Sequence, residues 1–118
     1  MVGTDIIEVA RIEKLIEQKG DKFLNRIYTQ NEIDYCESKG PNKYQHYAGR
    51  FAAKEAIIKA IKSSGINIPI DFSSIAVLNK SDGAPYVELD KTYNCSMKIS
   101  ISHTDTHAIS FALLVLNK

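Results

Sequence analysis

Charged side chains interrupt the otherwise apolar segment GRFAAKEAIIKAI in a pattern that suits phosphate chemistry. On a helix they form two sectors, because residues three or four positions apart face the same way. One sector holds Glu55, Lys59 and Lys62, and the other holds Arg50 and Lys54. Guanidinium groups bind a polyanion such as a diphosphate by forked contacts, and ammonium groups bind it as point charges. A solvated face is the alternative, but apolar residues run almost all the way round this helix and leave few sides for water.

Two carboxylates lie in apolar surroundings, and each needs a cation. Asp5 belongs to a short, partly β-branched segment near the start of the chain, and Glu55 belongs to the apolar helix. Burying either one unpaired would be costly. Two hard carboxylates with water and a phosphate oxygen are a typical magnesium arrangement. Each carboxylate could instead pair with a lysine or cap an amide, and their separation in the sequence says nothing about whether they meet. Both interpretations stay open on spacing alone.

Hydroxyl and imidazole groups follow one another in SISHT, at the end of a predicted strand. Ser102, His103 and Thr104 are donors suited to a phosphate, although a strand end before a turn often carries such residues. His103 and His107 have a spacing that on a helix would suggest zinc, but their flanks favour a strand and no cysteine is near. A hydrolase triad of Ser102, His103 and Asp105 is disfavoured too, because strand neighbours point to opposite faces and no nucleophile-elbow motif is present.

The first half of the chain is predicted to be mostly helical. Residues 2–7 favour a strand that runs into a helix ending at Gly20, since glycine suits a helix stop. Thr29 and Glu32 have the capping-box spacing, in which hydroxyl and carboxylate each satisfy an exposed amide, and this predicts a helix over about 30–38. The long apolar helix comes next and ends near the sequence SSG.

The second half of the chain is predicted to be strands. The segments SIAVL, PYVEL, MKISIS and HAISFALLVL are short and rich in residues that favour strands. Residues 79–83 predict the turn of a hairpin, and residues 103–106 predict a second turn. Three helices followed by antiparallel strands predict an α+β fold, in which the long buried helix packs on an antiparallel β-sheet.

Length and composition limit the partners. The 118 residues, 44% of them hydrophobic, predict one domain over residues 1–118 with an apolar face to spare for oligomerisation. Lys and Arg number 15 against 14 Asp and Glu, and a net charge of +1 argues against nucleic-acid binding. Cys36 and Cys95 are isolated, which fits a reducing cytosol. No apolar run reaches the roughly 20 residues of a membrane helix, so we expect a cytoplasmic protein without membrane contact.

Four motifs carry a resemblance to a known family: GTDIIEVARIE, GRFAAKEAIIKAI, DGAPY and SISHT, in this order along nearly the whole chain. They resemble the holo-acyl-carrier-protein synthases, the short class of 4'-phosphopantetheinyl transferases. The resemblance implies the 4'-phosphopantetheinyl transferase fold, a homotrimer with active sites at subunit boundaries, and a magnesium-dependent reaction. That reaction moves the 4'-phosphopantetheine arm of coenzyme A to a serine of apo acyl carrier protein, releases adenosine 3',5'-bisphosphate and supports fatty acid biosynthesis.

The resemblance also implies roles for individual residues. Asp5 and Glu55 match the magnesium ligands, and Lys59 matches a lysine near the pyrophosphate, so these three are the expected catalytic residues. The expected base is Glu55 or a water held by both carboxylates and the metal. Arg50 and His103 match positions that contact coenzyme A. With the charged helix and the turns, the expected coenzyme A-binding set is Arg50, Lys54, Lys59, Lys62, Gly65, Gly83, Pro85, Ser102, His103 and Thr104.

The expected partner is the acidic acyl carrier protein, which members of the family bind through their first helix. Arg11, Lys14 and Leu15 are therefore the expected docking residues. Glu13 and Glu17 share the same helix face, so the charge complementarity there is modest.

Two motifs depart from the family pattern. The hairpin motif of the family is usually glycine, a basic residue and proline, whereas Ala84 stands here in the middle position. A contact with coenzyme A is then lost or is supplied by Lys80. The Gly-x-Gly turn after the long helix keeps only its second glycine, Gly65, because Ser63 replaces the first. Neither departure affects the two carboxylates, so the expected activity stands.

Two functions of other classes compete with the transferase. One is a protein of the same fold that binds coenzyme A or a nucleotide without transfer, which the intact Asp5, Glu55 and Lys59 argue against. The other is a structural α+β subunit whose charged helix forms only salt bridges between subunits. Charge-neutral substitution of Glu55 or Lys59 would then reduce assembly or stability and nothing else.

Overall fold

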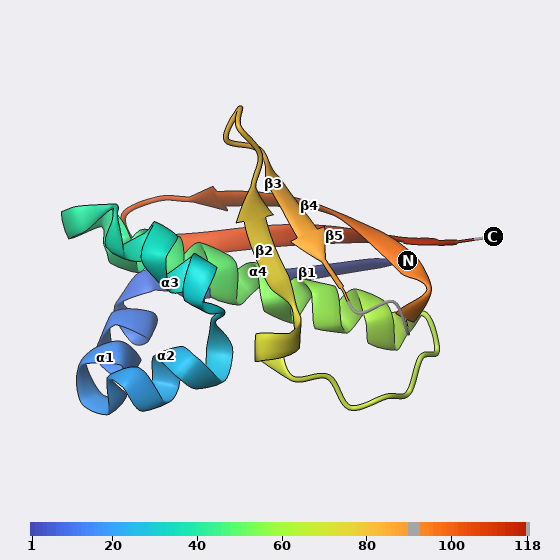
Figure 1. Ribbon diagram of the computed structural model, residues 1–118, viewed down its shortest axis with the longest axis horizontal. Helices are drawn as coiled ribbons and strands as arrows, with labels where there is room; N and C mark the ends of the chain where they lie inside the picture. The colour runs from blue at the N-terminus through green and yellow to red at the C-terminus, as the bar shows by residue number, and fades with distance from the viewer. Residues whose placement is uncertain (90–92, 118) are drawn as a thin grey trace.

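A long central helix organises the fold of the computed structural model, which describes residues 1–89 and 93–117 (Figure 1). This helix, α4, runs from Lys43 to Ser63 and buries residues on most of its sides. One side packs on the strands and the other packs on shorter helices, so α4 belongs to two separate clusters of buried residues. The near-continuous apolar pattern of its sequence therefore reflects burial between two layers.

Short helices gather near the N-terminal half of α4 (Figure 1). They are α1 (Val9–Lys19), α2 (Asp21–Ile27), α3 (Gln30–Glu37) and two single-turn 3₁₀ helices, η1 (Gly40–Asn42) and η2 (Phe72–Ser74). The capping box at the start of α3 is confirmed, since the amide of Glu32 donates to the Thr29 hydroxyl and the Glu32 carboxylate accepts from the Thr29 amide. The sequence prediction missed α2, a helix of only 7 residues that follows α1 directly after Gly20.

The strands form two antiparallel sheets rather than one. β1 (Val2–Glu8), β5 (His107–Leu116) and β4 (Cys95–His103) make a three-stranded sheet in the order β1-β5-β4. β2 (Ala76–Asn79) and β3 (Pro85–Glu88) make a separate hairpin. Both predicted turns are confirmed, and the α+β class is confirmed with them. The first strand joins the sheet by pairing with the last, which places Asp5 opposite Ser110.

Gly3 lets β1 lie directly on α4. A Cβ atom at this position would stand 1.9 Å from the carbonyl oxygen of Ala56 and 2.7 Å from the amide nitrogen of Ala60. Both are backbone atoms of the helix and cannot turn away as a side chain could. The close approach brings the residues that follow Gly3, among them Asp5, against the helix turn that carries Glu55 and Lys59.

The outer face of the three-stranded sheet is apolar and exposed. Alternate residues of a strand point to the same face, and paired residues of neighbouring strands share that face. Six exposed apolar side chains of β1 and β5 fall on it: Val2, Ile6, Ile109, Phe111, Leu113 and Val115. Among the described residues, no helix combines the length and the apolar character needed to cross a membrane.

Candidate active site

Strand β1 and helix α4 bring predicted catalytic residues together. The Lys59 ammonium lies 3.1 Å from the Asp5 carboxylate and also donates to the carbonyl oxygen of Thr4 at 3.1 Å. The Asp5 side chain is mostly buried, at 17% exposure, whereas that of Lys59 is 53% exposed. Asp5 therefore has the cation that its apolar surroundings require, and the cation remains open to solvent on its other side.

Glu55 lies one helical turn before Lys59, and the charges of Asp5 and Lys59 both affect its pKa. Partial burial raises the pKa of Glu55, and the negative charge of Asp5 raises this pKa further. The positive charges of Lys59, Lys62 and Arg11 oppose the rise. The negative charge of Asp5 on β1 therefore acts on Glu55 of α4, in partly desolvated surroundings that also hold cations.

The chemistry of this donor set fits a magnesium ion. Magnesium prefers hard oxygen ligands and commonly binds one or two carboxylates while keeping waters and substrate phosphate oxygens in its other positions. Within residues 1–89 and 93–117, no three His, Cys, Asp or Glu side chains gather as a closed metal site. The pair of Asp5 and Glu55 matches an open site, and a cation between them would relieve the repulsion that raises the pKa of Glu55.

Arg50 lies in a pocket between α3, α4 and the β2–β3 hairpin. It is only 5% exposed, and its guanidinium carbon stands 4.1 Å from the centre of the Tyr35 ring. One terminal nitrogen donates to the side-chain oxygen of Asn79, and the buried Nε has no acceptor within the described part of the chain. The residues that line this pocket of about 300 Å³ are Asn31, Tyr35, Arg50, Val77, Leu78, Asn79 and Tyr86.

A row of rings connects His103 with the Arg50 pocket. The His103 ring centre is 5.4 Å from that of His46, which is 5.6 Å from that of Tyr35, and Tyr35 lies against Arg50. Burial lowers the pKa of His46, and the neighbouring charges of His103, Lys39 and Arg50 lower it further. This corner is therefore electropositive. Sequence reasoning missed Tyr35, His46 and Lys39, because no motif contains them and only the packing of α3 on α4 reveals them.

Ser102 and Thr104 have surroundings different from those of His103. The Thr104 hydroxyl accepts from the backbone amides of Thr106 and His107, at 3.2 and 3.1 Å, and so stabilises the turn between β4 and β5. Ser102 is paired in register with Ile109 and belongs to the exposed outer face of the sheet. Contacts of either hydroxyl with a cofactor remain predictions.

The structure contradicts the prediction that Lys54 binds a cofactor phosphate. Its side chain has no exposed surface, and its ammonium lies 2.6 Å from the carboxylate of Glu32. Two backbone carbonyls, those of Ile27 and Phe72, accept the remaining hydrogen bonds at 2.7 and 3.1 Å. The helical wheel placed Lys54 with Arg50 correctly, but it could not show that this side of α4 is covered by the protein itself.

The turn residues of the predicted set lie at the ends of their elements. Gly65 follows α4 with φ of 88°, and Gly83 lies in the β2–β3 turn with φ of 91°, values that favour glycine. Pro85 begins β3. Ala84 does not disturb the hairpin, because its carbonyl accepts from the amide of Lys80 at 2.8 Å. Lys62 is exposed in the last turn of α4.

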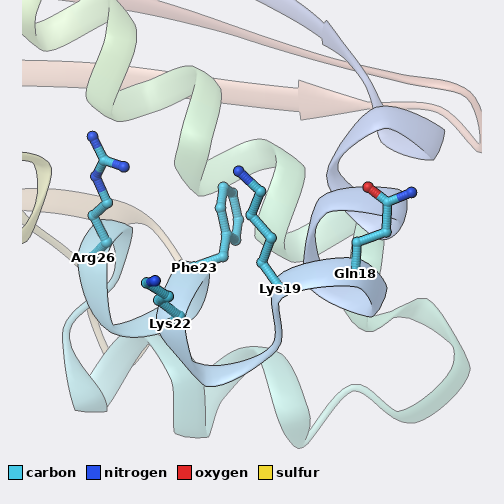
Figure 2. Close-up of a pocket in the computed structure, with 5 residues that line it drawn as sticks. All are labelled: Gln18, Lys19, Lys22, Phe23 and Arg26. Atoms are coloured by element: carbon cyan, nitrogen blue, oxygen red, sulfur yellow. The ribbon is translucent and has the colours of Figure 1, made fainter.

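The predicted docking residues lie on α1, where Arg11 and Lys14 are exposed and Leu15 is half-buried. Next to them is a basic hollow that sequence reasoning missed, since most of it is built on α2. Figure 2 shows the Phe23 ring between the side chains of Lys19 and Arg26. The hollow measures about 490 Å³, and its lining residues are Gln18, Lys19, Lys22, Phe23 and Arg26.

Comparison with known proteins identifies relatives over nearly the whole chain. The family model of the 4'-phosphopantetheinyl transferase superfamily matches residues 1–112. The chain is 44% identical to the holo-acyl-carrier-protein synthase of Ruminiclostridium cellulolyticum, over 98% of this chain and 92% of the relative. It is 46% identical to that of Chlorobium phaeovibrioides, over 96% of this chain and 92% of the relative.

Solved structures agree with the sequence relatives. A holo-acyl-carrier-protein synthase from Helicobacter pylori in complex with coenzyme A superposes with a TM-score of 0.85 and 35% identity, covering 98% of this chain and all of that one. A second, from Bacillus anthracis in complex with CoA (3',5'-ADP), superposes with a TM-score of 0.80 and 36% identity, covering 96% and 93%.

Proposed function

Since the chain belongs to the 4'-phosphopantetheinyl transferase superfamily, we propose that it is a holo-acyl-carrier-protein synthase. It transfers the 4'-phosphopantetheine arm of coenzyme A to a serine of apo acyl carrier protein. The products are holo acyl carrier protein and adenosine 3',5'-bisphosphate. The observation that carries the proposal is the meeting of Asp5 from β1 with Lys59 from α4, one turn from Glu55.

The reaction exchanges one phosphorus–oxygen bond for another. The serine oxygen bonds to the phosphorus that carries the pantetheine arm, and the bond from that phosphorus to the bridging oxygen breaks. Negative charge then builds up on the departing bisphosphate. Lys59 would offset this charge, and two observations support this role: its ammonium lies at the Asp5 carboxylate and its side chain is half exposed. Arg50 and His103 would bind other phosphate oxygens of coenzyme A, which the electropositive corner around Tyr35 and His46 supports.

Asp5 and Glu55 would hold a magnesium ion in this site. The bound ion would supply Lewis-acid stabilisation of charge on the pyrophosphate oxygens. The serine proton passes to Glu55 or to a water held by the two carboxylates.

Carrier protein would dock on α1 and α2 together. Arg11 and Lys14 give α1 exposed cations, and the hollow on α2 adds Lys19, Lys22 and Arg26. A hollow lined by the Phe23 ring and by these cations suits an acidic helix that carries one apolar side chain. The positive charge of Arg11 lowers the pKa of Glu55, so Arg11 lies near enough to the proposed metal site to affect it. This supports a docking face on α1 that continues into the site.

The assembly would be a homotrimer of single domains spanning residues 1–118. The exposed apolar face of β1 and β5 supports self-association, because monomers rarely leave a continuous patch of this kind in water. Ser102 and Phe111 lie on that face, and His103 follows directly at the end of β4. A neighbouring copy on the face would therefore border the coenzyme A pocket and place each active site at a subunit boundary.

Intact-mass analysis of a carrier protein tests the proposed function. Apo acyl carrier protein incubated with this protein, coenzyme A and magnesium should gain the mass of one phosphopantetheine. A carrier whose acceptor serine is replaced by alanine should gain nothing. If coenzyme A binds but several carriers stay unmodified, the protein is a non-catalytic binder and the proposal is wrong.

A further inference from the structure

A buried ion pair lies on the side of α4 away from the proposed metal site. Glu32 of α3 and Lys54 of α4 approach to 2.6 Å, and both side chains have no exposed surface. The Glu32 carboxylate also accepts from the backbone amide of Thr29 at 2.7 Å, through the capping box of α3. Its other oxygen accepts from the amide of Val77 in β2 at 2.8 Å. One carboxylate thus links two helices and a strand.

Lys54 extends this connection to two more segments. Its ammonium donates to the carbonyl of Ile27, the last residue of α2, and to the carbonyl of Phe72 in η2. The pair therefore satisfies backbone groups of segments that are distant in the sequence. Buried charges are tolerated when every donor and acceptor is satisfied in this way. Nothing in the proposed transfer reaction uses either residue.

The pair fixes the β2–β3 hairpin next to the coenzyme A pocket. Val77, whose amide Glu32 holds, is two residues before Asn79, whose side chain accepts from Arg50. Arg50 is one helical turn before Lys54 on α4. The hairpin forms its own two-stranded sheet rather than joining the larger one. Its position against α3 and α4 therefore depends on these side-chain bonds and on packing.

We propose that Glu32 and Lys54 are positioning residues for coenzyme A. They hold β2 against the helices, so that Asn79 orients the guanidinium of Arg50 over Tyr35 in the pocket. This inference rests on the proposed function, because it assigns that pocket to the phosphates of coenzyme A. Loosening the pair lowers affinity for coenzyme A and leaves the catalytic step unchanged.

The test removes both charges together, because removing one would leave the other buried without a partner. In the double variant Glu32→Gln, Lys54→Met, we expect calorimetry to show about tenfold weaker binding of coenzyme A, which corresponds to about 1.4 kcal/mol. The kcat at saturating coenzyme A should stay within about twofold of wild type. Hydrogen exchange should become faster in peptides covering β2 and β3 and stay unchanged in β5.

A matched control separates positioning from loss of stability. Ile12→Ala removes a fully buried side chain from the core cluster around α1 and should lower the urea midpoint without changing the affinity for coenzyme A. Equal losses of affinity in both variants would overturn the proposal. If the double variant does not fold, Asn79→Ala breaks the same connection at its other end and should also weaken binding of coenzyme A.

The two proposals fail in different ways. Wild-type protein that does not bind coenzyme A would contradict the proposed function. Wild-type protein that binds it, with unchanged affinity in the double variant or in Asn79→Ala, would contradict only the positioning role.

Discussion

Replacing Gly3 by alanine should displace β1 from α4 and strongly reduce transfer. The added Cβ would lie 1.9 Å from the Ala56 carbonyl oxygen, about 1.5 Å short of ordinary contact, and it would also crowd the amide of Ala60. Since both obstacles are helix backbone, the strand itself must move. Asp5 lies two residues further along that strand and would move with it.

The expected cost of this substitution is large. Overpacking that forces a backbone shift costs roughly 1–3 kcal/mol, and we expect the upper end, about 3 kcal/mol, because no side chain can yield. For a domain of this size each kcal/mol lowers Tm by roughly 4 °C, so Tm should fall by about 12 °C. A displacement of about 1 Å at the site should reduce transfer by about 100-fold.

Gly49→Ala provides the matched control. A Cβ at Gly49 would meet the Cγ2 atom of Ile101 at 3.0 Å, a side-chain contact that a shift of a few tenths of an ångström would relieve, rather than helix backbone. Alanine is also favoured over glycine inside a helix by about 1 kcal/mol, which offsets the contact. Urea unfolding and the intact-mass assay should therefore find Gly49→Ala close to wild type. Wild-type stability and transfer in Gly3→Ala would refute the close packing of β1 on α4.

Three further substitutions test the metal site, the docking face and the apolar sheet face. Glu55→Gln should lower transfer by at least about 100-fold in the intact-mass assay, since the lost interaction acts on charge in the transition state. Because burial and Asp5 raise the folded-state pKa of Glu55, its ionised form destabilises the protein. Urea unfolding should accordingly find Glu55→Gln more stable than wild type at pH 8, with the difference vanishing below the unfolded-state pKa; a difference that grows with acidity would contradict this sign. Lys22→Glu should raise the KM for carrier protein about tenfold at low salt and leave the KM for coenzyme A unchanged, and an equal rise in both would argue against docking at α2. Phe111→Lys should dissociate the oligomer in sedimentation and reduce transfer, whereas Ile68→Lys, which replaces an equally exposed apolar residue at 48%, should do neither.

Local signals in the sequence predicted the helices and turns whose residues interact with near neighbours. Thr29 and Glu32 cap α3 as their spacing indicates, because both partners of the capping box lie within one helical turn. α2 was missed because its 7 residues are too few for a clear apolar period and directly follow the end of α1. Because α2 was not predicted, the basic hollow around Phe23 was not predicted either.

Tertiary packing determines contacts that the sequence pattern could not predict. Periodicity grouped Lys54 with Arg50, yet only the packing of α3 and η2 on that side of α4 shows that Lys54 is covered. Asp5 and Glu55 are far apart along the chain, and spacing gave no sign that they approach each other. Their approach depends on the pairing of β1 with β5 and on the absence of a side chain at Gly3.

A magnesium titration of the transfer reaction tests the metal site most directly. The rate of phosphopantetheine addition to apo carrier would be measured by intact mass at saturating coenzyme A, for wild type, Asp5→Asn and Glu55→Gln. The wild-type rate should rise with magnesium to saturation and fall to background with EDTA, and both variants should stay near background at every concentration. A wild-type rate that persists in EDTA, or variants that reach it, would contradict a metal site formed by Asp5 and Glu55.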